Sequence, residues 1–199
     1  MFKKIQDIWQ RFSGAGVYPH ELSFILETPL RNLIISPEQL ADRLHLSPDS
    51  TVLELGPGPG FFSVEVARRI PGGKLVLFDI QREMVVKSRV KLQRSGLNNI
   101  HPAQGNALSL PFSAGSYDVV FLVTVLGEVP QPEECLKNIS RVLLPGGLLS
   151  ITEQKGDPDA LTQVQLLQMG EVYGFEFVET FPFRGGFTLN LRRGTKRAG

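Results

Sequence analysis

The sequence contains one cysteine, Cys135, and no run of apolar residues long enough to cross a bilayer. A single cysteine excludes an internal disulfide and a multi-cysteine metal site, and a membrane-spanning helix needs about 20 consecutive apolar residues. Residues 1–12 also lack the continuous apolar core and small-residue cleavage site of a secretory signal. We therefore predict a soluble protein of the cytoplasm.

Neither sign of charge is in excess. The chain has 21 lysines and arginines against 20 acidic residues, a net charge of +1. Proteins that bind nucleic acids usually carry a basic patch, and the one basic stretch here is the tail, residues 192–197, where a solvated terminus is the better interpretation. No nucleic-acid partner is expected.

Residues 1–12 place apolar side chains at helical spacing with basic residues between them. Such a stripe either packs on the rest of the protein or lies on a membrane surface. Packing is favoured, because surface helices usually bury their stripe in their own fold. A second helix is predicted to start at Pro37, with Ser36 as its cap and Gln39 reaching back to the cap amide.

Beyond Ser50, short apolar runs alternate with helical patterns. This alternation predicts a mainly parallel, doubly wound α/β sheet with helices on both faces. One helix is expected to end at Pro145-Gly146-Gly147, and the next helix is expected to be capped by Asp157-Pro158-Asp159. An antiparallel hairpin is expected at residues 175–192. The expected parallel strands are residues 51–55, 74–80, a run ending before Gly105, 117–123 and 148–152. We interpret residues 1–199 as one domain, with a helical amino-terminal extension (1–49), a core (50–155) and a carboxyl-terminal helix and hairpin (156–199).

The most informative stretch runs from a buried strand into a loop with Gly56, Gly58 and Gly60 at alternate positions. Glycine adopts backbone angles closed to other residues and lets a ligand lie against the main chain. In an open parallel sheet, ligands bind beyond the carboxyl ends of the strands, where this loop must lie. A dinucleotide fingerprint needs glycine or alanine three positions after its second glycine. Phe61 occupies that position, which disfavours a nicotinamide or flavin cofactor.

Two polar residues follow the next strands. Asp79 ends the second strand, where its carboxylate can accept hydrogen bonds from a ribose diol or cap the following helix. The glycine loop beside it favours the ribose. Asn106 follows the third strand and offers a donor and an acceptor to an adenine edge, but Gly105-Asn106 is equally typical of a turn.

Taken together, these motifs resemble class I S-adenosylmethionine-dependent methyltransferases, in particular the small group similar to ubiquinone- and menaquinone-pathway enzymes. The resemblance covers roughly residues 50–155. The motifs that carry it are Glu54-x-Gly56-x-Gly58-x-Gly60, Asp79, Asn106-Ala107, Leu110-Pro111-Phe112, Tyr117-Asp118-Val119-Val120 and Pro145-Gly146-Gly147. It implies a seven-stranded Rossmann-like sheet whose final strand is inserted antiparallel beside the sixth.

The resemblance also implies how S-adenosyl-L-methionine, and its product S-adenosyl-L-homocysteine, would bind. The loop from Glu54 to Gly60, with Pro57, would hold the methionine part and Asp79 the ribose. The adenine would contact Ile80, Asn106 and Ala107, and Val123 would supply main-chain contacts near the methionine end. Two departures stand out: Asn106 replaces the aspartate of many relatives, and Gly127-Glu128 stands where many carry histidines, which weakens the transfer of a catalytic mechanism.

A sulfonium-bound methyl group is already activated, so an enzyme needs mainly to align it and exclude water. Where a base is needed, Glu128 is the leading candidate, against the alternative of an exposed loop carboxylate. Tyr18 and His20 are candidate substrate contacts on an amino-terminal lid, or residues packed locally. Residues 122–129 lack the Asp/Asn-Pro-Pro-aromatic and Pro-Cys motifs of DNA methyltransferases. A small-molecule or lipid-like acceptor is therefore favoured; the alternative is a non-catalytic cofactor-binding module.

Overall fold

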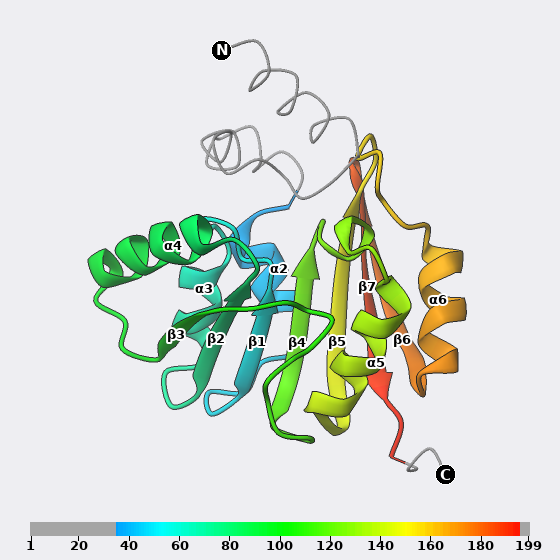
Figure 1. Ribbon diagram of the computed structural model, residues 1–199, viewed down its shortest axis with the longest axis horizontal. Coiled ribbons are helices and arrows are strands. Elements are labelled where there is room, and N and C mark those ends of the chain that lie inside the picture. The colour runs from blue at the N-terminus through cyan, green and yellow to red at the C-terminus, as the bar shows by residue number, and fades with distance from the viewer. Residues whose placement is uncertain (1–34, 196–199) are drawn as a thin grey trace.

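Seven strands form one sheet in the order β3-β2-β1-β4-β5-β7-β6 in the computed structural model, which describes residues 35–195 (Figure 1). The strands are β1 (Thr51–Leu55), β2 (Lys74–Asp79), β3 (Ile100–Gln104), β4 (Tyr117–Val123), β5 (Leu143–Gln154), β6 (Phe175–Phe183) and β7 (Gly186–Arg193). Strands β1 to β5 pair in parallel, and β7 runs antiparallel between β5 and β6. The predicted sheet, with its antiparallel final strand, is confirmed.

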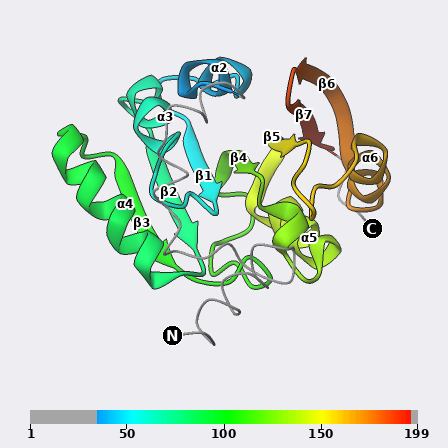
Figure 2. The same cartoon turned by 90° about the horizontal axis from the view of Figure 1, so that it is seen from above.

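Helices cover both faces of this sheet. They are α2 (Pro37–Arg43), α3 (Ser63–Arg69), α4 (Arg82–Ser95), α5 (Pro132–Val142) and α6 (Gln163–Val172), with a short 3-10 helix, η4 (Leu126–Glu128). Figure 2 shows α5 on the opposite side of the sheet from α2 and α3. Among the helices within residues 35–195, none is long and apolar enough to cross a membrane.

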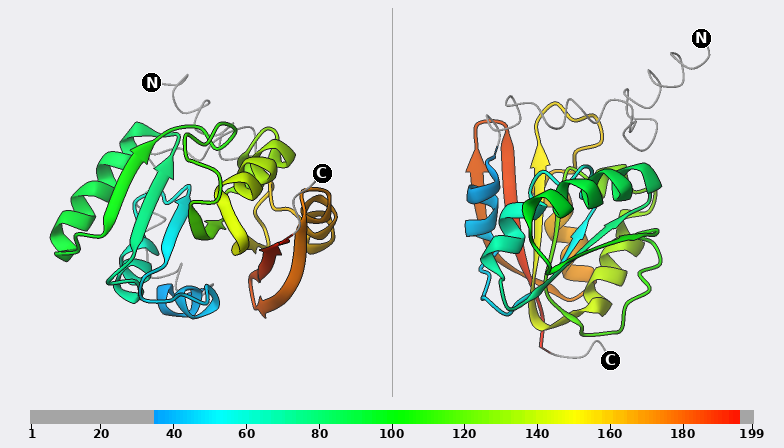
Figure 3. Two further views of the ribbon diagram at one scale, coloured as in Figure 1. Left: turned by 90° about the horizontal axis from the view of Figure 1, so that it is seen from below. Right: turned by 90° about the vertical axis from the view of Figure 1, so that its left-hand side faces the viewer.

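The alternation of side chains along the strands divides the core into two layers. Val52 of β1 packs with α2, α3 and Leu92 of α4 on one face, while its neighbour Leu53 packs with α5 and Leu166 of α6 on the other. Successive side chains of a strand point to opposite faces, so the buried apolar runs of β1, β2 and β4 serve both layers. The hairpin β6–β7 lies at the end of the sheet remote from β3 and α4 (Figure 3).

Local sequence signals explain several element ends. Helix α2 begins with the predicted capping box, in which the Ser36 hydroxyl accepts from the Gln39 amide and the Gln39 side chain accepts from the Ser36 amide. Such a box satisfies two amides that the helix itself leaves without partners. Helix α4 ends at Gly96, whose φ of 70° provides the left-handed turn that closes a helix.

Two predicted boundaries are wrong. The helix α5 ends at Val142 rather than at Pro145-Gly146-Gly147, which lies inside the irregular start of β5. The cap of α6 is Thr162, which forms a capping box with Gln165, whereas the Asp157 side chain instead accepts from the amide of Asp159 in the preceding turn. In both cases the conspicuous turn motif lies near the helix end without forming it.

Candidate functional site

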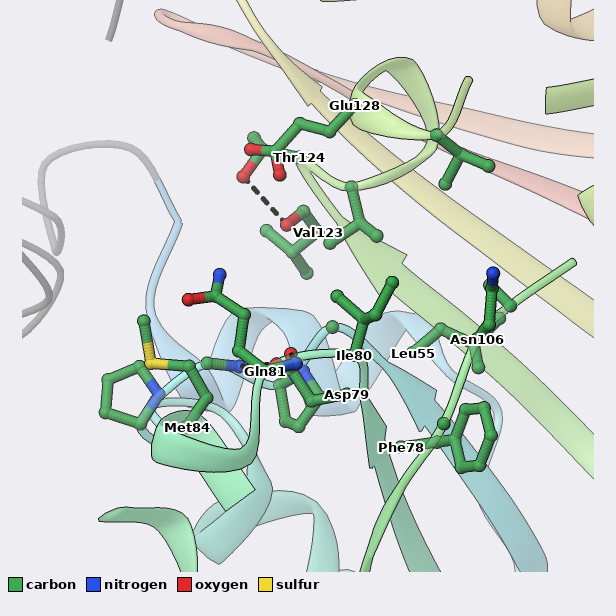
Figure 4. Close-up of a pocket in the computed structure, with 18 of the residues that line it drawn as sticks. Leu55, Phe78, Asp79, Ile80, Gln81, Met84, Asn106, Val123, Thr124 and Glu128 are labelled. Carbon is green, nitrogen blue, oxygen red and sulfur yellow. Dashed lines mark hydrogen bonds between the residues drawn. The ribbon is translucent and has the colours of Figure 1, made fainter. Parts of the chain in front are cut away.

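A cavity lies beyond the carboxyl ends of β1, β2 and β4, where the sequence places its glycine loop (Figure 4). Its empty volume is ≈ 950 Å³, including the space that opens to solvent. The cavity is lined by Leu55, Gly56, Pro57, Gly58, Pro59, Phe78, Asp79, Ile80, Gln81, Met84, Gly105, Asn106, Ala107, Val123, Thr124, Val125, Glu128, Val129 and Pro130. Eight of the ten predicted cofactor-binding residues are therefore in this lining; Glu54 and Gly60 are not.

The glycine loop needs its glycines for two reasons: their backbone angles, and the space that a side chain would otherwise fill. Gly56, Gly58 and Gly60 all have left-handed backbones, with φ of 64°, 53° and 80°, a conformation that costs other residues roughly 1–2 kcal/mol. A β-carbon on Gly56 would also lie 2.5 Å from Cγ2 of Val125, which follows β4. The loop thus lies directly against the segment after β4, and the cavity runs between them.

Glu54 lies under the loop rather than in the cavity. Its carboxylate is buried and accepts a 2.6 Å hydrogen bond from the hydroxyl of Ser63, the first residue of α3. The bond joins the strand before the loop to the helix after it, so Glu54 holds the two ends of the loop together. The ligand contact that the resemblance implies at this position stays a prediction, and the hydrogen bond to Ser63 shows that Glu54 also supports the loop.

Asp79 lies next to the glycine loop and forms part of the same cavity wall. One carboxylate oxygen accepts from the Gly58 amide at 3.3 Å and the other from the Gln81 amide at 2.8 Å. Burial raises the pKa of this carboxyl group, and the two amide hydrogen bonds partly oppose that effect. Each oxygen retains a further lone pair, so the carboxylate is oriented by the protein and can still accept from the hydroxyls of a ligand. The helix α4 is capped at Gln81 without a side-chain hydrogen bond, so Asp79 is not its cap residue.

Asn106 forms a turn and lines the cavity at the same time. Its side-chain oxygen accepts from the Leu108 amide at 2.9 Å, which is the turn geometry that the sequence left open. Gly105 before it lies against the Phe78 ring, where a β-carbon would approach to 2.1 Å. The Asn106 amide nitrogen is a further potential donor in the cavity lining.

The connection from β3 to β4 is held by aromatic contacts. Phe112 packs edge-on against Phe78 and Tyr117, with ring centroids 5.2 and 5.3 Å apart. Arg141 of α5 donates to the carbonyl oxygens of Leu110 and Phe112, each at 2.6 Å. The motif Leu110-Pro111-Phe112 therefore fixes the loop that carries Asn106 and Ala107.

Glu128 lies at the opposite end of the cavity from Asp79, in η4 (Figure 4). It is half-buried rather than an exposed loop carboxylate. Val129 and Pro130 follow it in the lining, and the polar Thr124 lies beside it (Figure 4). Gly127 beside it lies so close to the backbone of Asp159 that a β-carbon would meet the carbonyl oxygen at 1.8 Å. The segment after β4 is thus fixed by the segment after β5.

Two residues at this end were missed by sequence reasoning. Thr124 lines the cavity with a φ of 54°, and its hydroxyl donates to the carbonyl of Val123 at 2.7 Å. A positive φ is unusual for a β-branched residue, and such strain clusters at functional sites. No sequence signal marks it, because threonine is not a residue expected in that conformation.

Glu153, near the end of β5, is the second missed residue. Only 2% of its surface is exposed, and its Oε1 has no hydrogen-bond partner among the residues described. Burial raises the pKa of Glu153 to about 8, with smaller contributions from the charges of Asp157 and Glu128. Burial therefore favours the protonated form of Glu153, which lies close enough to Glu128 to feel its charge.

The remaining predicted contacts, Tyr18, His20 and the stripe in residues 1–12, lie outside the described residues 35–195. Their assignments stay predictions.

Comparison with known proteins identifies the family that this geometry belongs to. A family model described as a methyltransferase domain matches residues 46–173. The chain belongs to this family. The match spans the glycine loop, Asp79, Asn106 and Glu128, so the predicted class I S-adenosylmethionine-dependent methyltransferase family and its cofactor are confirmed.

Individual relatives support the same assignment. The chain is 34% identical over 142 residues to a ubiquinone/menaquinone biosynthesis C-methyltransferase, UbiE, from Haemophilus ducreyi, covering 70% of this chain and 52% of that protein. It is 37% identical over 98 residues to a demethylmenaquinone methyltransferase from Lactococcus lactis, covering 49% and 39%. The chain thus spans about half or less of these relatives' lengths. A methyltransferase from Aquifex aeolicus has the same fold, with a TM-score of 0.84, 21% identity, and coverage of 89% of this chain and 100% of that one.

Proposed function

We propose that this chain transfers a methyl group from S-adenosylmethionine to a carbon atom of an aromatic, lipid-like acceptor of the quinone-precursor type. One observation carries the proposal: a single cavity is lined by the glycine loop and Asp79 and, at the end opposite Asp79, by Glu128 (Figure 4). A donor site and an acceptor site are thereby contiguous, as direct transfer between two bound molecules requires.

We assign the cofactor contacts from the lining residues. Gly56, Pro57 and Gly58 would face the methionine part, with Glu54 and Gly60 supporting the loop beneath. Asp79 would accept from the ribose hydroxyls. The adenine would lie against Ile80, near Asn106 and Ala107, and Val123 would contact the methionine end. When bound, the cofactor supplies a methyl group on a positively charged sulfur.

The acceptor is inferred from the opposite end of the cavity. Val129 and Pro130, which follow Glu128 in the chain, offer apolar surface, and Glu128 is the carboxylate there. An aromatic ring with an apolar tail fits such a surface, and the names of the two relatives specify quinone biosynthesis and demethylmenaquinone. These names support the substrate class for this chain.

The work of the protein is mainly alignment. Holding the acceptor carbon in line with the methyl group and excluding water can supply about 7–11 kcal/mol in favourable cases. As the new carbon–carbon bond forms, the bond between the methyl carbon and sulfur breaks, which leaves S-adenosylhomocysteine, and the acceptor ring loses one proton. Glu128 would accept that proton, and a base in this role typically contributes about 10²–10⁴-fold.

Two measurements test the proposal. Calorimetry with S-adenosylhomocysteine tests the donor site, and transfer of labelled methyl groups to a short-chain prenyl naphthoquinol tests the acceptor site. We expect binding and labelled product in both. Binding without transfer, either to this probe or to a cell extract, would support the non-catalytic module instead. Transfer to an extract component but not to the naphthoquinol would refute the acceptor class alone.

A further inference from the structure

The outer face of α4 carries apolar side chains that no other element within residues 35–195 covers. Val86 is 54% exposed and Val90 43% exposed. Residues four apart lie on the same face of a helix, so the two side chains form one patch. The inner face buries Met84, Ser88 and Leu92 against the sheet. Apolar residues therefore occur on both faces of α4, whereas a typical surface helix has a polar outer face.

Basic side chains surround this patch. The helix has five basic residues and one acidic residue, Glu83, which gives it a charge of +4. The whole chain has a charge of +1, so the remainder carries −3. At 100° per residue, the exposed Glu83 falls beside Val90. Arg82 and Arg89 fall on one side of the two valines and Lys87 and Arg94 on the other. All four are exposed. We define the α4 face as Val86 and Val90 with these four basic residues.

The α4 face adjoins the mouth of the cavity. Three residues at and just before the first turn of α4 line that cavity: Ile80, Gln81 and Met84. Figure 1 shows α4 at the outer edge of the molecule, beside β3. A surface that contacted this face would lie close to the opening through which ligands pass.

We propose that the α4 face docks the protein on an anionic lipid bilayer, from which the lipid-like acceptor enters the cavity. Exposed aliphatic side chains flanked by basic residues are the arrangement that binds the boundary between head groups and acyl chains. A nucleic acid would match the charges but would offer no apolar partner to Val86 and Val90 at the centre of the face. The inference rests on the proposed function, because it names the source of that function's acceptor.

The test is sedimentation of the full chain with vesicles of 30% phosphatidylglycerol and 70% phosphatidylcholine. Each basic side chain near an anionic surface strengthens binding about fivefold. The variant Arg89→Glu/Arg94→Glu is therefore expected to bind at least about 25-fold more weakly. The variant Val86→Ser/Val90→Ser is expected to lose binding with its net charge unchanged. Neutral phosphatidylcholine vesicles are expected to sediment little of the wild-type protein.

A matched control separates the α4 face from overall charge. Arg68→Glu/Lys137→Glu changes the net charge by the same amount at side chains that are 60% and 62% exposed, on α3 and α5. We expect it to bind almost as the wild type does. Equal loss in both charge-reversal variants, or no binding by the wild type, would overturn the proposal.

Two further outcomes would also overturn it. Loss of binding on removal of residues 1–12, with the α4 variants unaffected, would place the contact at the amino terminus. Tighter binding of a single-stranded RNA than of vesicles, lost in the same arginine variant, would make the partner a nucleic acid. Calorimetry with S-adenosylhomocysteine on every variant keeps the two hypotheses apart: retained affinity leaves the proposed function intact even if vesicle binding fails.

Discussion

The backbone amide of Gly58 donates a hydrogen bond of 3.3 Å to the carboxylate of Asp79. The two residues follow neighbouring parallel strands and are 21 positions apart in the chain. The bond shows that the glycine loop and the acidic residue form one wall of the same cavity. A second amide, that of Gln81, fixes the other carboxylate oxygen, so the orientation of Asp79 is set before any ligand binds.

Substituting Gly56 tests whether the loop is shaped by its packing. Gly56→Ala would force alanine into a left-handed backbone conformation and place its β-carbon 2.5 Å from Val125. We expect it to lower the free energy of unfolding by about 2–5 kcal/mol, because backbone strain and overpacking add. Urea denaturation followed by circular dichroism measures the change.

Gly156 provides the matched control for this substitution. Its φ is 89°, but a β-carbon there would meet nothing within 4 Å. Gly156→Ala should therefore lower the free energy of unfolding only by the backbone strain, about 1–2 kcal/mol. A Gly56 variant no less stable than the Gly156 variant would show that Val125 moves away and that the contact does not shape the loop.

The buried carboxyl of Glu153 gives the stability a defined pH dependence. Its folded pKa of about 8 lies above the ordinary value of 4.5, so folding favours the protonated form. The resulting contribution to stability is complete below pH 4.5 and is lost as pH rises towards 8, at about 1.4 kcal/mol per pH unit. The amide introduced by Glu153→Gln cannot ionise, so this variant should gain stability relative to the wild type between pH 5 and pH 8. A constant difference in free energy of unfolding across that range would contradict the assignment.

Glu128 can be separated from cofactor binding by kinetics. Glu128→Gln keeps the shape of the side chain and removes the base, so kcat for methyl transfer should fall by about 10²–10⁴-fold. The affinity for S-adenosylhomocysteine should stay the same, because Glu128 lies at the other end of the cavity from Asp79. Glu133→Gln, on the exposed surface of α5, is the control and should leave kcat unchanged. An equal effect of the two substitutions would remove Glu128 from the mechanism.

The sequence predicts the parallel core well because the signals there are local. Apolar runs define β1 and β4 over the residues observed, and the pattern Ser36-Pro37-x-Gln39 fixes the start of α2. The same kind of signal is present for α6: Thr162 is followed three positions later by Gln165, a capping box. The more conspicuous Asp157-Pro158-Asp159 leads to the wrong predicted cap, because aspartate and proline are also typical of a helix start.

The end of the cavity around Glu128 is less predictable, because it depends on contacts between distant segments. Glu153 is buried in β5, and β5 pairs with β7, which follows more than thirty residues later in the chain. The strained backbone of Thr124 and the approach of Gly127 to Asp159 likewise arise only once the loops after β4 and β5 pack together. No local pattern encodes such contacts.

The most direct test of the central claim, that Asp79 and the glycine loop bind the cofactor, is the calorimetric Kd of S-adenosylhomocysteine for wild type and Asp79→Ala. A hydrogen bond to a charged group contributes about 1.5–3 kcal/mol, so the Kd should rise about 10- to 150-fold. Asp42→Ala, which removes an exposed partner of Arg69, should leave the Kd unchanged. An Asp79→Ala protein that stays folded and binds S-adenosylhomocysteine as tightly as the wild type would contradict the claim.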